Sequence, residues 1–253
     1  MTPNHTLRAG ITKSQRAPTF YELRADTRLF NLTPGNVFVP VGAQVPVVGW
    51  LYRSSGTVKA ESLISNEIGY LGHFREANLK VDARAFVERM NNRVTVQGQT
   101  IPNPPFPAFA VRDFVNLPGP HLHGFEYQFD WRPLPDTRLV LSEMHIRSKP
   151  GTFVDEGLEA PFRSNSLTWF QKLPGNFDFT AISSASTPFK WASGGQLINT
   201  PRRLDVRLGM PFALGATRGE ASVTVQAING GHQIYKRDQR FERRAFATLR
   251  LDF

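Results

Sequence analysis

The sequence contains no cysteine. That absence excludes disulfide scaffolds, zinc–thiolate sites, iron–sulfur clusters and thiol catalysis. No uninterrupted apolar run approaches the roughly 18 residues that would indicate a transmembrane helix. The opening residues, MTPNHTLRAG, contain no basic stretch followed by an apolar core, so no secretory signal is recognised in them. Motifs for serine hydrolases, zinc proteases and P-loop nucleotide binding are also missing.

The length of the chain allows one large all-β domain or two ordinary ones. Of 253 residues, 40% are hydrophobic, which is too many for a disordered chain. The mean hydropathy of -0.30 does not decide between a soluble and a membrane protein. A membrane barrel also scores as hydrophilic, because only alternate residues of its strands meet lipid. The formal charge is +9, but the basic residues form no clustered stripe, so no nucleic-acid partner is predicted.

Apolar and polar residues alternate along most of the chain, and no segment has a convincing helical period. In residues 78–89, Leu79, Val81 and Ala83 alternate with Lys80 and Asp82. Successive side chains of a strand point to opposite faces, so such a segment has one apolar and one charged face. The pattern predicts about ten strands. They cover residues 6–12, 66–74, 78–89, 111–133, 138–147 (where both faces are mixed and the register is undefined), 162–173, 177–186, 203–212, 220–229 and 243–253.

The connections between these strands alternate between long and short. Short hairpins at one rim and long loops at the other are typical of outer-membrane barrels. Aromatic residues also collect near strand ends, where interfacial girdles are expected. The sequence therefore predicts an antiparallel transmembrane β-barrel in a Gram-negative outer membrane. A soluble β-barrel or sandwich remains the alternative, because alternation alone does not say which face meets lipid.

Four segments carry recognisable strand motifs. Residues 5–23 (HTLRAGITKSQRAPTFYEL) rise into an R-A-P element, and residues 58–74 (VKAESLISNEIGYLGHF) contain E-x-G, with Ala60 where proline is usual. Residues 115–133 (VNLPGPHLHGFEYQFDWRP) contain an N…G-x-E pattern, and residues 243–253 (RRAFATLRLDF) end on an aromatic. In this order they resemble the C-terminal half of a TonB-dependent outer-membrane receptor.

The resemblance implies a 22-stranded barrel plugged by an N-terminal domain. It also implies active import of a scarce nutrient such as a ferric siderophore, cobalamin or haem. With about ten strands and no recognisable plug, residues 1–253 are expected to be the C-terminal part of such a barrel, with the plug domain and the N-terminal strands absent. The implied partners are the TonB complex (through the absent part), outer-membrane lipid, the barrel-assembly machinery, and a small-molecule or metal-chelate ligand.

Two other functions stay open. One is a self-contained small outer-membrane barrel acting as a pore or a protease, for which Asp113, Asp130 and His145 are the catalytic candidates. The other is a soluble all-β binding protein. His121 and His123 share one face of a strand, so they are conceivable metal ligands. The expected interpretation, however, is a histidine pair in the lumen or at the rim of the barrel that binds no metal. No enzyme activity, cofactor or metal site is predicted.

Ligand contact in a receptor is expected from the long loops. Basic and aromatic side chains there suit an anionic, partly aromatic chelate. The resemblance further implies that the last strand carries the signal read by the barrel-assembly machinery, in Leu249, Leu251 and Phe253. The predicted ligand-binding residues are Arg16, Tyr21, Tyr52, Arg53, Trp191, Tyr235 and Arg237.

Overall fold

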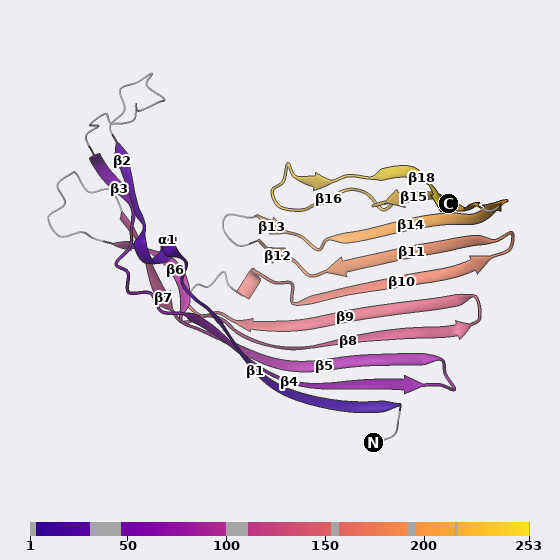
Figure 1. The fold of residues 1–253 in the computed structure, drawn as a ribbon, viewed down its shortest axis with the longest axis horizontal. Helices are drawn as coiled ribbons and strands as arrows, with labels where there is room; N and C mark the ends of the chain where they lie inside the picture. Colours follow the sequence, from indigo (N-terminus) through magenta and orange to yellow (C-terminus); the bar gives the residue numbers. More distant parts are fainter. Residues whose placement is uncertain are drawn as a thin grey trace. The chain divides into compact units, whose positions relative to one another are not determined.

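The computed structural model describes residues 4–30, 47–99, 111–152, 157–191, 196–215 and 217–252 (Figure 1). These residues are almost entirely β-strand, as predicted. The chain divides into two compact units, and each is described by itself. The large unit comprises Met1–Ile11, Ser65–Glu88 and Pro120–Phe253, and the small unit comprises Thr12–Ile64 and Arg89–Gly119.

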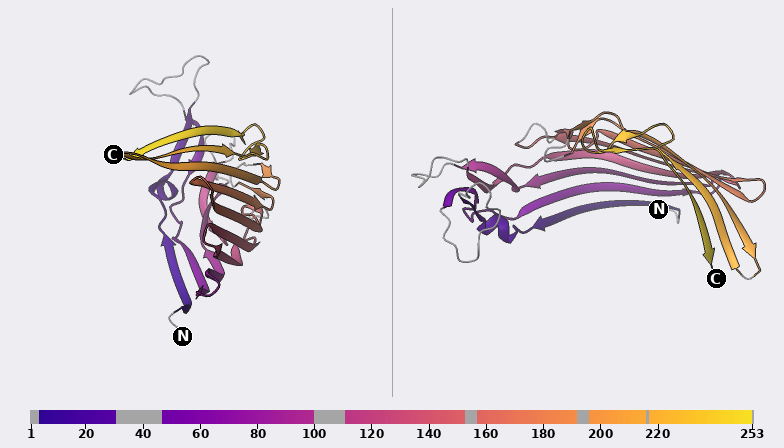
Figure 2. Two further views of the ribbon diagram at one scale, coloured as in Figure 1. Left: turned by 90° about the vertical axis from the view of Figure 1, so that its right-hand side faces the viewer. Right: turned by 90° about the horizontal axis from the view of Figure 1, so that it is seen from above.

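Ten strands form one antiparallel sheet, in the order β1-β4-β5-β8-β9-β10-β11-β14-β15-β18. Each strand pairs with the next member of the series along the chain, and the sheet of the large unit is curved (Figure 2). Within the described residues β1 and β18 are the two edges, so the sheet is not closed into a barrel. The strands are β1 (His5–Arg16), β4 (Glu61–Phe74), β5 (Leu79–Asn91), β8 (His121–Leu134), β9 (Thr137–Lys149), β10 (Arg163–Leu173), β11 (Phe177–Ser186), β14 (Arg202–Leu214), β15 (Thr217–Gln226) and β18 (Arg244–Asp252).

Short turns join the strands at one end of this sheet. The turns that follow β4 and β10 use Asn78 (φ 49°) and the pair Gly175 (φ 79°) and Asn176 (φ 63°). Glycine and asparagine enter this left-handed region at the lowest steric cost, which explains why they occupy the tight turns. The long connections lie between the hairpins, and they contain the remaining strands.

The strand register separates two faces. Directly paired residues point to the same side of a sheet. One continuous row of paired residues runs Trp131, Leu139, Trp169, Ala181, Val206, Val225 and Ala245, and we call the side to which it points the apolar face. The next row along the strands therefore points to the opposite side, which we call the charged face; it consists of Asp130, Val140, Thr168, Ile182 and Asp205.

The small unit contains a four-stranded sheet of order β2-β3-β7-β6. A short helix, α1 (Phe20–Arg24), precedes it, with Thr19 and Glu22 forming a capping box. Ala25, Val58 and Phe114 form its buried core. The strands are β2 (Asp26–Phe30), β3 (Val47–Arg53), β6 (Arg93–Gln99) and β7 (Val111–Leu117).

Two sequence expectations differ from the structure in this region. No helix was expected, yet α1 forms, because the capping box satisfies backbone N–H groups that a helix of this length otherwise leaves unpaired. Residues 111–133 were expected as one strand, but β7 and β8 belong to different sheets. Pro118 and Pro120 lie between them, and proline has no N–H to donate to a ladder.

Two small ladders occupy loops of the large unit. They pair β12 (Phe189–Lys190) with β13 (Leu197–Ile198), and β16 (His232–Gln233) with β17 (Arg240–Phe241). In the part of the chain that the structure describes, no helix has the length and apolar character needed to cross a membrane.

Candidate ligand-binding site

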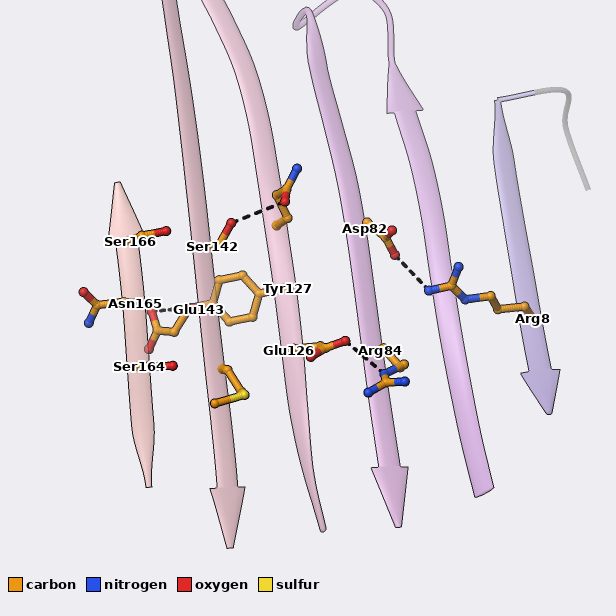
Figure 3. A pocket seen from close by; sticks show the side chains of 12 residues that line it. Arg8, Asp82, Arg84, Glu126, Tyr127, Ser142, Glu143, Ser164, Asn165 and Ser166 are labelled. Atoms are coloured by element: carbon orange, nitrogen blue, oxygen red, sulfur yellow. Dashed lines mark hydrogen bonds and ion pairs between the residues drawn. The ribbon is translucent and has the colours of Figure 1, made fainter. Parts of the chain in front are cut away.

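A pocket of about 380 Å³ lies on the sheet of the large unit, where charged side chains of β1, β5 and β8 meet (Figure 3). Arg8 Nη2 is 3.2 Å from Asp82 Oδ1. Arg84 Nη1 is 3.0 Å from Glu67 Oε2, and Arg84 Nε is 3.0 Å from Glu126 Oε1. The pocket is therefore polar and lined by alternating charges.

Ion pairs continue along the charged face beyond this pocket. Asp130 on β8 accepts two hydrogen bonds from Arg138 on β9, both of 2.9 Å. Arg207 on β14 pairs with Glu220 on β15. These side chains remain partly exposed, so each pair contributes little stability, and the face is suited to contact with water.

In the small unit, Tyr21, Tyr52 and Phe114 form an aromatic cluster. The ring centroids are 5.9 Å apart for Tyr21–Tyr52, 5.6 Å for Tyr21–Phe114 and 5.7 Å for Tyr52–Phe114. Arg112 lies 5.9 Å from the Tyr52 ring, and its Nη1 donates to the Tyr52 hydroxyl at 3.4 Å. The structure thus brings two predicted residues together, and adds Phe114 and Arg112, which the sequence reasoning missed. Tyr21 is 48% exposed, so the cluster presents an aromatic surface.

Arg53 lies in a second basic group of the same unit. Its guanidinium is 5.0 Å from the Trp50 ring, and Trp50 Nε1 donates to Asp26 Oδ1 at 2.9 Å. Arg28 Nη2 is 2.6 Å from Asp26 Oδ2. The hydrogen bonds from Arg28 lower the pKa of Asp26, so this carboxylate stays charged and holds the basic side chains in place.

Arg16 is engaged in contacts that hold the fold. Its Nε is 2.5 Å from Glu61 Oε2 and its Nη1 is 2.9 Å from Glu22 Oε2. Glu22 also accepts from the backbone N–H of Thr19 at 2.6 Å. The hydrogen bond from Arg16 is the main cause of the lowered pKa of Glu22.

The other predicted residues lie in loops of the large unit. Trp191 Nε1 donates to the Ile234 carbonyl at 2.6 Å, next to Tyr235, and is itself 48% exposed. The Arg237 N–H donates to Gln196 Oε1 at 2.9 Å. Two loops far apart in sequence are therefore tied together, with an exposed tryptophan at their junction.

The catalytic candidates are not assembled. Asp130 and His145 lie on opposite faces of the ten-stranded sheet, because Asp130 pairs with Val140 whereas His145 pairs with Phe125. Asp113 accepts hydrogen bonds from the backbone N–H groups of Ser55 and Phe114 at 3.0 and 2.7 Å, so its carboxylate fixes the backbone of these two segments.

No cluster of three or more metal-ligating side chains occurs in the described ranges. His121 and His123 lie on β8, opposite Lys149 and Arg147. Of the predicted assembly signal, Leu249 and Leu251 are exposed on the edge strand β18, and Phe253 lies outside the described residues.

A curved antiparallel meander with one charged and one apolar face defines a piece of a β-barrel protein. The family model described as "TonB dependent receptor-like, beta-barrel" matches residues 1–235. The chain therefore belongs to the TonB-dependent receptor β-barrel family, which confirms the resemblance carried by its strand motifs. The comparison with curated protein sequences gave no significant match.

Solved structures share the fold at low sequence identity. The ferric enterobactin receptor PfeA of Pseudomonas aeruginosa has a TM-score of 0.69 at 13% identity, covering 99% of this chain and 38% of its own. The siderophore receptor PirA of Acinetobacter baumannii has a TM-score of 0.69 at 13% identity, with 100% and 40% covered. The FrpB iron transporter of Neisseria meningitidis has a TM-score of 0.65 at 15% identity, with 99% and 36% covered. The chain thus spans about 40% of the length of these relatives.

Proposed function

We propose that this chain is the C-terminal barrel part of an outer-membrane receptor that imports a metal chelate with energy from TonB. Family membership is the observation that carries the proposal. The similar structures include a ferric enterobactin receptor, a siderophore receptor and an iron transporter, which favours a chelated metal over other nutrients. In the complete receptor the TonB complex and the barrel-assembly machinery are partners, the latter through Leu249, Leu251 and Phe253.

In this proposal the apolar face meets outer-membrane lipid and the charged face lines the lumen. Two observations support that assignment. Large apolar side chains such as Val223 and Leu249 are 56% and 64% exposed, which is costly in water and favourable in lipid. The ion pairs around Arg84 lie on the other face, where water hydrogen-bonds to the charged atoms that have no protein partner.

The ligand is proposed to contact the exposed basic and aromatic side chains of the long connections. The cluster of Tyr21, Tyr52 and Phe114 with Arg112 offers ring faces and a positive charge. That combination suits an anionic chelate with aromatic groups. Trp191, Tyr235 and Arg237 offer a similar combination in the loops of the large unit. Arg16 contributes to ligand binding indirectly, because its ion pairs with Glu22 and Glu61 hold the fold around the cluster.

The test is uptake by cells that carry the complete receptor gene containing this chain, compared with a deletion strain. The probes are ⁵⁵Fe-enterobactin, a catecholate, and ⁵⁵Fe-ferrioxamine, a hydroxamate, each with and without an uncoupler. Deletion should remove the energy-dependent uptake of at least one chelate. Unchanged uptake of both would contradict the proposed ferric-chelate transport.

A pair of point variants tests the aromatic cluster. Tyr21→Ala should weaken uptake of the transported chelate, because it removes an exposed ring of the cluster. Phe20→Ala is the matched control, since the neighbouring Phe20 is 82% exposed on the same helix and, among the described residues, its ring does not contact the cluster. Equal effects of the two variants on uptake would show that the cluster is not part of the ligand-binding site.

A further inference from the structure

One aromatic ring holds the long connection between β15 and β18 against the charged face of the large unit. The guanidinium carbons of Arg203 on β14 and Arg244 on β18 lie 4.3 and 4.7 Å from the centroid of the Phe241 ring. Alternation along the two strands puts both arginines on the charged face. The imidazole of His232 stacks on the same ring at a centroid distance of 5.7 Å. His232 is therefore part of the contact that joins this connection to the sheet.

The same histidine belongs to the small ladder within the connection. In this ladder β16 and β17 place His232 opposite Phe241. Directly after β16, the Ile234 N–H donates to the Gln239 carbonyl at 3.0 Å, which closes the segment between the two strands. We call residues 232–241 the loop ladder. Separation of the His232 and Phe241 rings would open the loop ladder at its base.

The surroundings of His232 favour its neutral form. Its Nδ1 is shielded from solvent and has no hydrogen-bond partner within the described ranges of the chain. Burial lowers the pKa of His232 below its ordinary value of 6.5. The positive charges of Arg203 on β14 and Arg240 on β17 lower this pKa further, whereas Asp205 on β14 acts in the opposite direction. A proton on this imidazole is therefore opposed by burial and by charge.

The carboxylates near the imidazole are already paired with arginine. Asp205 Oδ2 is 2.6 Å from Arg203 Nη2, and Glu242 Oε1 is 3.2 Å from Arg240 Nε. Arg244 on β18 adds a third guanidinium to the ring stack. Three arginines thus face two carboxylates, and a charged imidazole would increase the excess of positive charge.

The loop ladder also positions a group of the predicted ligand-binding residues. Tyr235 and Arg237 lie within it, and Trp191 Nε1 donates to the Ile234 carbonyl at 2.6 Å. The Arg237 N–H donates to Gln196 Oε1 at 2.9 Å. Both contacts join the loop ladder to the connection between β11 and β14. Opening of the loop ladder would therefore break the common arrangement of these three side chains.

We propose that His232 is an acid-sensitive switch, whose protonation opens the loop ladder and separates Tyr235 and Arg237 from Trp191. An imidazolium donates from both ring nitrogens, and the shielded Nδ1 has no acceptor among the described residues. The closed loop ladder is fully favoured above pH 6.5, and it loses stability as the pH falls through the lowered pKa of His232. The opening is a property of this chain alone, whereas its effect on ligand uptake rests on the function proposed above.

The experiment measures hydrogen exchange of the complete, folded receptor by mass spectrometry. Protection factors, corrected for the intrinsic pH dependence of exchange, are compared at about pH 7.5 and about pH 5.5, which bracket the titration of an ordinary histidine. Ordinary carboxylates stay ionised at both values. Peptides that cover residues 232–241 should lose protection at the acidic value, while β14 and β15 keep theirs.

Variants of the histidine separate charge from packing. His232→Phe keeps a ring on Phe241 but takes up no proton, so its loop ladder should stay closed at both pH values. His232→Gln is a second neutral variant, with a smaller polar side chain, and its protection should also be independent of pH. His73→Phe is the matched control, because it removes a histidine from the short-turn end of β4 and should keep the pH dependence of the original receptor.

Three outcomes would overturn the inference. The first is an original receptor whose loop ladder keeps its protection in acid. The second is a loss in acid that persists in His232→Phe, which would assign the effect to another group. The third is a loop ladder that is open in both neutral variants at about pH 7.5, because packing of the imidazole would then decide the closed state. Absence of ferric-chelate uptake would refute the proposed function alone, since the exchange measurement needs no ligand.

Discussion

The small and the large unit differ in how far their apolar side chains are exposed. In the small unit Ala25, Val58 and Phe114 are 5%, 8% and 8% exposed and pack into a core. In the large unit, residues such as Val223 and Leu249 are 56% and 64% exposed, although that unit contains more of the chain. The small unit is thus built like a water-soluble domain, whereas the large unit is organised around strand pairing.

Under the outer-membrane location proposed above, this difference reflects two kinds of surroundings, water around the small unit and lipid against the apolar face of the large unit. A core forms where water surrounds a structure, because burial removes apolar surface from water. A sheet whose apolar face meets lipid needs no core, since every backbone group is satisfied by a neighbouring strand. The predictions below test whether the two units respond to substitution as these surroundings require.

The largest effect is expected in the small unit. Phe114→Ala removes the ring around which Tyr21, Tyr52 and Val58 pack, and truncating a buried phenylalanine costs about 3–5 kcal/mol. Hydrogen exchange of β7 in the complete receptor should accelerate by two orders of magnitude or more, from about 1.4 kcal/mol per factor of ten.

The strands of the large unit should keep their protection in this variant. Val96→Ala on β6 serves as a control, because Val96 is 37% exposed and its truncation leaves no cavity. Loss of protection in β14 and β15 upon Phe114→Ala would show that the units do not respond separately.

A smaller effect is expected on the apolar face of the large unit. Val223→Arg places a charge between Leu208 and Ala247, which should cost about 2–4 kcal/mol if this position is near the bilayer midplane. The measurement is the free energy of unfolding in lipid vesicles. Thr168→Arg puts the same charge on the charged face, and it should be tolerated. The reverse result, with Thr168→Arg the more destabilising, would invert the assignment of the two faces.

The smallest effect is a pH dependence confined to the small unit. Arg16 lowers the pKa of Glu22 below its ordinary value of 4.5, so the ionised form is favoured when the unit is folded. The stabilisation is present above pH 4.5 and is lost as pH falls through the lowered pKa. Proteolysis around α1 should increase on acidification and should change less with pH in Glu22→Gln. An identical pH profile for Glu22→Gln and for the turn control Glu76→Gln would exclude this carboxylate as the cause.

The alternating pattern was sufficient to predict the strands of the large sheet and their apolar and charged faces. It could not assign the register of β9, and the structure shows why. Glu143, His145 and Arg147 share a face with Leu139 and Leu141, so neither face is purely apolar. The mixed pattern was itself the signal of the charged residues Glu143, His145 and Arg147 on the apolar face.

The small unit was harder to predict, because its arrangement depends on pairing between distant segments. Tyr21 and Tyr52 were chosen for their chemistry, but nothing local places Phe114 beside them. The parallel pairing of β3 with β7 likewise joins separate connections. The helix α1 was predictable in part, because Thr19-x-x-Glu22 is the sequence pattern of a capping box.

The open edges of the ten-stranded sheet impose a parity rule on whatever strand pairs with them. Side chains alternate with a period of two, so a neighbour that joins β18 or β1 one residue out of step exchanges its two faces along its whole length. A slip of two residues keeps both faces, so the polarity of the outer surface reveals an odd-numbered slip but not an even-numbered one.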